Sequence, residues 1–168
     1  MKIVIAVDST CDLSPELIKE NDIKIMPLYV NLGEQSLKDG IEIVPADIFK
    51  YVEETGNLPK TSAVPIGEFI DVFEELKKDA DAVIYFSISS GFSSSYQNAV
   101  VAAEEVENVY VVDTKNLSTG EGLLVLKACK MAKEGKSPEE IVKEVTILAE
   151  RVDASFVIEK LDFLHNGG

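Results

Sequence analysis

The chain has 168 residues, with 16 basic and 30 acidic side chains that give it a net charge of −14 at pH 7. With 46% hydrophobic residues, a chain of this length is expected to form one domain with a sizeable core, which excludes a disordered acidic tail. The negative charge argues against nucleic acid as a partner and against docking on an anionic membrane.

Targeting and cysteine patterns point to the cytoplasm. No segment approaches the roughly 18 consecutive apolar residues of a membrane span, so we expect no integral membrane segment. The apolar run at 3–7 is too short for the core of a signal peptide. Cys11 and Cys129 lie far apart and outside any metal-spaced cluster, and we expect both to be reduced and buried.

Short apolar runs alternate with helical patterns along the chain, which is typical of an α/β protein. Residues 3–7 predict a strand that is buried on both faces. Ser14 predicts the N-cap of a helix over 15–22. The next apolar stretch, 23–32, predicts an extended segment that is interrupted at Pro27.

The following segment predicts one more strand and two helices. The apolar residues 41–44 predict a short strand, which we expect to pair with 25–31 as an extension at one edge of the sheet. Helical patterns cover 45–56 and 67–79. Two prolines and the lack of periodicity in 57–65 predict a loop between these helices.

The second half of the chain continues the alternation, and Ser137 and Glu140 form a capping-box pattern at the start of its last helix. Strands are expected at 82–89, 108–114 and 154–159, and helices at 96–106, 121–135 and 137–152. We predict one mostly parallel sheet, with helices on both faces, from the strands near 3–7, 83–88, 109–113 and 154–158. Residues 1–168 contain no internal repeat or linker, so we expect a single α/β domain.

Polar turns follow three of the expected strands, at the edge where open α/β sheets bind their ligands. These turns cover 8–14, 89–98 and 113–122, and they gather hydroxyl side chains and backbone N–H groups. Because the N-terminus of a helix favours an anion, the arrangement predicts recognition of a carboxylate or phosphate by neutral donors.

Known catalytic motifs are not matched by these turns. The turn at 89–98 lacks the second glycine and the lysine of a P-loop, and the chain has no dinucleotide GxGxxG and no GxSxG nucleophile elbow. Gly91-Phe92-Ser93 comes closest to such an elbow, but the only histidine, His165, lies three residues from the end. The sequence therefore predicts no catalytic residue.

Several polar residues have two interpretations. Asp8 and Asp12 share a turn, but two carboxylates do not make a metal site, and a helix N-cap at Asp12 or Ser14 is favoured; we expect no metal. Asp113 fits a ligand-orienting group and a turn-forming residue about equally well. The hydroxyls of 93–95 exceed what a helix cap needs, which favours a ligand role, whereas the pattern at 60–62 fits a ligand site and a plain loop equally.

Five short motifs occur in the order and spacing of a known protein family. They are Asp8-Ser9-Thr10-Cys11-Asp12-Leu13, Lys60-Thr61-Ser62 followed by Pro65, Ser89-Ser90-Gly91 through Ser93 and Tyr96-Gln97, Val111-Val112-Asp113 with Ser118 and Gly120, and Leu161-Asp162-Phe163-Leu164 with Gly167-Gly168. Over essentially its whole length the chain resembles the DegV family. The chain departs from the family's usual motifs at two places, with Ala63-Val64 before Pro65 and Ser94-Ser95 before the tyrosine. Both departures keep the hydroxyl groups that we expect to contact a ligand.

The resemblance implies a DegV N-terminal-domain fold and a fatty-acid-binding carrier protein rather than an enzyme. DegV-like proteins hold a long-chain fatty acid and, in many cases, present its carboxylate to a fatty acid kinase, which links them to phospholipid metabolism. Carried over to this chain, Thr61 and Ser93 would donate hydrogen bonds to the carboxylate, and an apolar tunnel would hold the tail. The fatty acid is then the ligand, and no cofactor is expected. Secondary candidates for the ligand site are Ser9, Ser62, Gly91, Phe92, Ser94 and Ser118.

The resemblance also bears on domain organisation. The family's second domain begins just after Gly167-Gly168, so we expect this chain to be truncated before that domain, with an uncovered face that allows self-association. Two other functional hypotheses stay open. One is a serine hydrolase or acyltransferase that uses Ser93, and the other is an incomplete domain with no ligand of its own.

Overall fold

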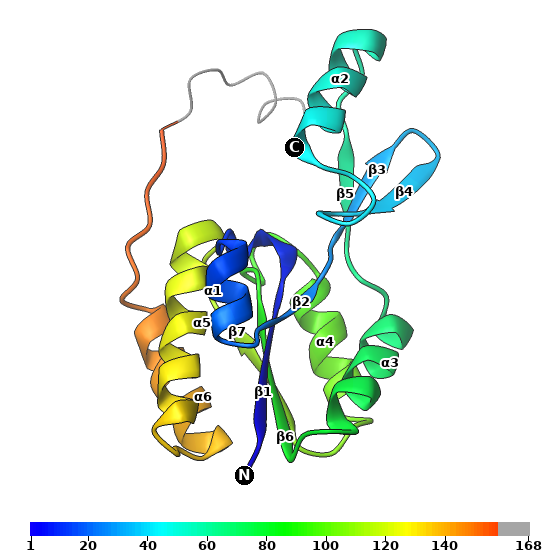
Figure 1. The fold of residues 1–168 in the computed structure, drawn as a ribbon. Coiled ribbons are helices and arrows are strands. Elements are labelled where there is room, and N and C mark those ends of the chain that lie inside the picture. The colour runs from blue at the N-terminus through cyan, green and yellow to red at the C-terminus, as the bar shows by residue number, and fades with distance from the viewer. Residues whose placement is uncertain (158–168) are drawn as a thin grey trace.

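A parallel sheet forms the centre of the protein in the computed structural model, which describes residues 1–157 (Figure 1). Its strand order is β2 (Lys24–Met26), β1 (Ile3–Asp8), β6 (Ala82–Ser87) and β7 (Val109–Asp113). Neighbouring strands are parallel at all three pairings. The strands expected at 3–7, 82–89 and 108–114 are therefore confirmed.

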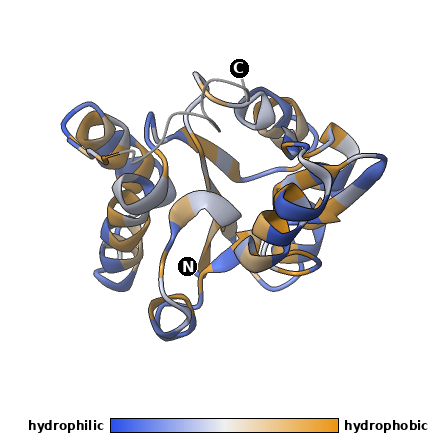
Figure 2. Ribbon diagram, turned by 90° about the horizontal axis from the view of Figure 1, so that it is seen from above, coloured by the Kyte–Doolittle hydropathy of each residue, from blue (hydrophilic) through white to orange (hydrophobic). Residues whose placement is uncertain are grey.

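Helices cover both faces of this sheet, as the view from above shows (Figure 2). One face carries α1 (Pro15–Glu20), α5 (Ser118–Lys133) and α6 (Pro138–Ala149), and the other carries α3 (Ile66–Lys77) and α4 (Ser95–Ala103). Side chains alternate along β1, so that Ile5 and Val7 join the first hydrophobic cluster while Val4 and Ala6 join the second. The α/β fold with helices on both faces is confirmed.

Three aromatic rings hold α3 against the sheet. The ring of Tyr85 lies 5.2 Å from that of Phe69 and 5.8 Å from that of Phe73, in both cases in an edge-on arrangement. All three side chains are completely buried. Because α3 begins a few residues after β5 (Lys60–Ser62), this packing also fixes where that strand leaves the main body.

The helix ends follow the capping signals in the sequence. Ser14 accepts a hydrogen bond from the Leu17 N–H of α1, and Ser137 and Glu140 form the expected capping box of α6. The helix α2 (Pro45–Thr55) ends at Gly56, whose φ of 70° lies in the left-handed region. These ends are confirmed.

A small antiparallel sheet stands above the main sheet, next to α2 (Figure 1). It has the order β4 (Gln35–Lys38), β3 (Tyr29–Leu32) and β5, and Gly33, with a φ of 62°, turns the β3–β4 hairpin. The prediction of an unbroken loop over 57–65 was wrong, because residues 60–62 pair with β3 and form β5.

The prediction of a strand at 41–44 was also wrong. The N–H groups of Ile41 and Glu42 both donate to the Lys38 carbonyl, which folds this segment into a turn, and Val44 serves as the N-cap residue of α2. The expected pairing of 25–31 with 41–44 is wrong for the same reason. Instead, β2 pairs with β1, and β3 pairs with β4 and β5.

The last expected strand, at 154–159, is wrong in its described part. Residues 154–157 pair with no strand of the described chain, and Phe156 and Val157 are 70% and 99% exposed. The rest of that strand, and the closing segment with Gly167 and Gly168, lie outside the described residues.

Candidate functional site

The loops that follow β1, β6 and β7 meet at one edge of the main sheet, because these three parallel strands are neighbours. Ser9 follows β1, the loop 88–94 follows β6, and Ser118 begins α5 after β7. The expectation that the polar turns share the carboxyl edge of the sheet is confirmed. Thr61 and Ser62 come from elsewhere, since both lie in β5 of the small sheet.

A buried carboxylate fixes the first two of these loops to each other. Asp8 is fully buried, and its Oδ1 accepts hydrogen bonds from the Thr10 N–H at 3.0 Å and from Thr10 Oγ1 at 2.6 Å. Its Oδ2 accepts the Ile88 N–H at 2.6 Å. Asp8 thus holds the start of the loop that carries Ser93. Of the two N-cap residues that the sequence offered, Ser14 is confirmed, whereas Asp12, with a φ of 49°, ends the short turn over Ser9–Cys11.

A second buried acid, Glu121, reaches the same threonine from α5. Its Oε2 lies 3.0 Å from Thr10 Oγ1, but Thr10 has one hydroxyl proton, which the shorter contact directs to Asp8. Burial, and secondly the nearby Asp8 charge, raise the pKa of Glu121 to about 10. At neutral pH Glu121 is therefore protonated and donates to Thr10. Burial also raises the pKa of Asp8, although its three hydrogen bonds oppose that shift.

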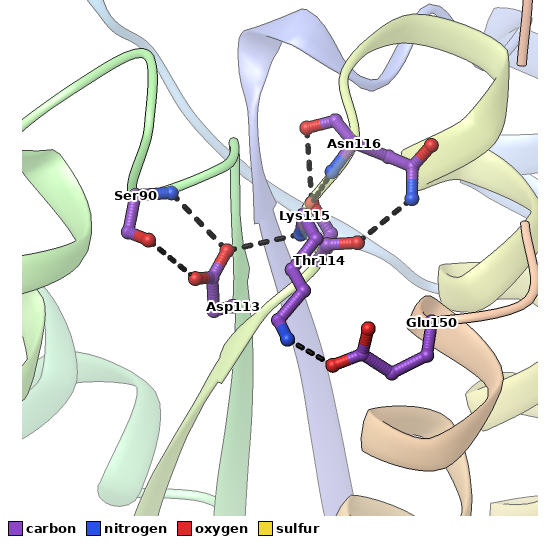
Figure 3. A network of polar contacts seen from close by, with 6 residues as sticks. All are labelled: Ser90, Asp113, Thr114, Lys115, Asn116 and Glu150. Carbon is purple, nitrogen blue, oxygen red and sulfur yellow. Dashed lines mark hydrogen bonds and ion pairs between the residues drawn. The ribbon is translucent and has the colours of Figure 1, made fainter.

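Asp113 ties the loop after β6 to the loop after β7 (Figure 3). Its Oδ2 accepts the Ser90 hydroxyl at 2.5 Å, and its Oδ1 accepts the N–H groups of Ser90 at 3.1 Å and of Lys115 at 2.9 Å. Lys115 in turn forms an ion pair with Glu150. Both carboxylate oxygens of Asp113 are thus engaged within the loops, as the turn-forming interpretation predicts.

Ser93 lies half-buried just before α4. Its Oγ accepts the Ser95 N–H at 3.1 Å and lies 3.0 Å from Ser95 Oγ. The neighbouring candidates Gly91, Phe92 and Ser94 are exposed. Ser93 is therefore the one hydroxyl of residues 93–95 that is both ordered by hydrogen bonds and open to a ligand.

Thr61 lies in the middle of β5, opposite Val30 of β3, and its side chain is exposed. The chain leaving β5 is fastened to α4 at Val64, whose carbonyl accepts the Asn98 side chain at 2.8 Å and whose N–H donates to Ser95 Oγ at 3.4 Å. Ser95 therefore contacts both the Ser93 hydroxyl and the segment that follows Thr61.

The secondary candidates divide into two groups. Phe92 and Ser118 line a hollow of about 190 Å³ at the N-terminus of α5, whose other lining residues include Ser155. Ser9 accepts the Leu28 N–H at 3.2 Å and joins the loop after β1 to the segment before β3, and Ser62 pairs with β3 through the backbone. The structure thus brings Phe92 and Ser118 together, whereas Ser9 and Ser62 have structural contacts.

The sequence patterns did not single out Glu121 or Asn98. Thr10 and Glu121 are 111 residues apart along the chain, and each stood in a polar turn without any signal of pairing. Ser95 was only one of three adjacent hydroxyls, and its complete burial is what separates it from Ser94.

Within residues 1–157, no group of three or more His, Cys, Asp or Glu side chains is arranged to hold a metal ion. In the same part of the chain, no helix combines the length and the apolar character needed to cross a bilayer.

The main sheet and its edge of hydroxyl and N–H donors define an α/β protein of the class that binds ligands outside the carboxyl ends of its strands. The model of the DegV protein family matches residues 2–168. This protein belongs to the DegV family, and the recognition from the five motifs is confirmed. Among its relatives, a DegV domain-containing protein of Caldanaerobacter subterraneus is 40% identical over an alignment of 169 positions, which covers 99% of this chain and 60% of the relative.

Solved structures of the family have the same fold. A DegV family protein from Thermus thermophilus, described by its fatty acid binding, matches with a TM-score of 0.88 and 36% identity over 99% of this chain and 60% of its own. DegV from Bacillus subtilis, described as a fatty acid binding protein, matches with a TM-score of 0.82 and 34% identity, over 89% of this chain and 54% of its own. A stearic acid-binding protein from Eubacterium ventriosum matches with a TM-score of 0.75 and 31% identity, over 84% of this chain and 51% of its own.

Proposed function

We propose that this protein binds a long-chain fatty acid, with the hydroxyls of Thr61 and Ser93 donating to the carboxylate and an apolar tunnel holding the tail. The observation that carries the proposal is the TM-score of 0.88 to a fatty-acid-binding relative. The ordering of Ser93 at the N-terminus of α4 supports it, because neutral donors at a helix start can hold an anion despite the acidic surface.

The energetics divide the work between tail and head group. A chain of about 15 methylene groups contributes on the order of 12 kcal/mol when it is buried, before immobilisation costs are subtracted. Each hydroxyl donor to a charged group adds roughly 1.5–3 kcal/mol. The tail therefore provides most of the affinity, while Thr61 and Ser93 fix the orientation of the carboxylate.

The finer role proposed here is that of a cytoplasmic carrier in phospholipid metabolism that presents the carboxylate to a fatty acid kinase. The chain spans about 60% of the length of the curated relatives it matches, so this role concerns the whole protein.

We also propose self-association through the exposed apolar side chains Phe92 and, around α2, Ile41 and Phe49. Light scattering tests the self-association, and a strictly monomeric protein would contradict it.

We propose a binding role in preference to catalysis by Ser93. The contacts of the Ser93 side chain within residues 1–157 are the N–H and hydroxyl of Ser95, and neither group is a general base. Strong labelling of Ser93 by a fluorophosphonate probe would favour the hydrolase hypothesis instead.

The experiment that tests the proposal is mass spectrometry of the purified protein under native conditions, followed by identification of the lipid after organic extraction. We expect a mass increase of one fatty acid per chain, or uptake of one stearate when that lipid is added. Protein that carries no fatty acid and takes up no stearate would refute the proposal.

A further inference from the structure

Ser95 is a fully buried serine at the first position of α4, and it lies behind the proposed carboxylate donor Ser93. Its exposed fraction is 0%. Its backbone N–H donates to Ser93 Oγ at 3.1 Å, and the two hydroxyl oxygens are 3.0 Å apart. On its other side, Ser95 Oγ accepts the Val64 N–H at 3.4 Å.

The protons in this group can be assigned one by one. A serine hydroxyl has one proton to donate and two lone pairs. If Ser93 donates its proton to a ligand, Ser95 is free to donate its own proton to Ser93 Oγ, while the Val64 N–H still donates to Ser95. The result is a continuous chain from Val64 through Ser95 to Ser93, in which each hydroxyl both accepts and donates.

We propose that Ser95 is the positioning residue of the carboxylate site: it accepts from the Val64 N–H and directs the Ser93 hydroxyl proton toward the bound anion. This inference rests on the proposed function. Donating to Ser93 Oγ removes the competing acceptor for the Ser93 proton and polarises that hydroxyl, because hydrogen bonds in a chain strengthen one another. The burial of Ser95 keeps water from taking its place.

The same residue couples the two proposed donors. Val64 follows Thr61 by three positions, is itself fully buried, and has its carbonyl held by the Asn98 side chain of α4. Ser95 therefore connects the end of β5, which carries Thr61, to the loop that carries Ser93. We expect its loss to affect the anion site more than the tail-binding surface.

A double-mutant cycle on stearate affinity tests this role. Ser95→Ala should weaken stearate binding by about 3- to 10-fold, while the Ser95 N–H bond to Ser93 preserves the loop. Ser95→Thr, which keeps the hydroxyl, should bind within about twofold of wild type. Ser95→Cys keeps the shape of the side chain at a slightly larger size but is a weak donor and acceptor, so it should resemble Ser95→Ala. Ser87→Ala, at another fully buried serine, is the matched control and should leave affinity unchanged.

The cycle separates positioning from a structural role. If Ser95 acts mainly through Ser93, Ser95→Ala causes a much smaller loss in the Ser93→Ala background than in wild type, and its effect on 1-octadecanol, which has no charge, is smaller than on stearate. Equal losses in both backgrounds, or full affinity in Ser95→Ala and Ser95→Cys, would overturn the inference and leave the proposed function standing. Wild-type protein that binds neither probe would instead overturn the proposed function, and this inference with it.

Discussion

Replacing Glu121 by glutamine should stabilise the protein at neutral pH. Glu121 is fully buried, and burial raises its pKa from 4.5 to about 10. In the folded protein it is therefore neutral and donates a proton to Thr10, whose own proton goes to Asp8. A glutamine amide also donates, so Glu121→Gln reproduces the protonated acid without its titration.

The size of the effect follows from proton linkage. Below pH 4.5 the side chain is protonated in both folded and unfolded states, so its burial adds no pH dependence. Between that pH and about 10, the unfolded chain ionises Glu121 while the folded protein does not. The free energy of unfolding therefore falls with rising pH by about 1.4 kcal/mol per unit. At pH 7 this amounts to roughly 3 kcal/mol, which glutamine avoids.

Urea unfolding between pH 5 and pH 9 measures this difference. The stability advantage of Glu121→Gln should be small at pH 5, should reach about 3 kcal/mol at pH 7 and should keep growing toward pH 9. Glu53→Gln, at an exposed position of α2, controls for the loss of one negative charge and should show no such trend. If Glu121→Gln keeps the pH dependence of wild type, or is less stable at pH 8, the buried acid is ionised and the reasoning fails.

Two further predictions concern the packing beneath the site. Gly122→Ala should destabilise the protein by about 1–3 kcal/mol in urea unfolding, because its Cβ would lie 2.8 Å from the Cys11 carbonyl oxygen and 2.9 Å from Leu13 Cδ2; unchanged stability would contradict this close approach. Burial raises the pKa of both the Cys11 and Cys129 thiols to about 11, so a disulfide reagent at pH 8 should label them slowly in native protein and rapidly in urea, whereas equal rates would show that the thiols are accessible.

The main sheet could be predicted because its strands are continuous apolar runs. Residues 3–7 and 82–87 are buried on both faces, and only a sheet covered by helices on both sides buries such runs. Helix ends could also be predicted where a local capping signal marks them, as Ser137 and Glu140 do at the start of α6.

The small sheet could not be predicted because its pairing is not local. The polar residues of β5 form a strand only because β3, about thirty positions earlier, offers its free edge. Conversely, 41–44 has the alternation of a strand but lies between a turn and the start of α2. In both segments, contacts with distant or neighbouring elements determine the structure, and the result differs from what the local sequence pattern predicts.

The candidate site shows the same division. The hydroxyls of Thr61 and Ser93 stand out in the sequence and in its resemblance to the DegV family. By contrast, the roles of Ser95 and Glu121 depend on burial and on contacts with distant segments. Spacing along the chain carries no information on either.

The most direct test of the central claim is the stearate affinity of Thr61→Val and Ser93→Ala beside wild type. Each variant removes one hydrogen bond to a charged group, worth roughly 1.5–3 kcal/mol, so each should bind stearate about 10- to 100-fold more weakly while the protein stays folded. Ser36→Ala, at an exposed serine of β4, should bind like wild type. If both Thr61→Val and Ser93→Ala bind stearate as tightly as wild type, the carboxylate is not held by these two hydroxyls.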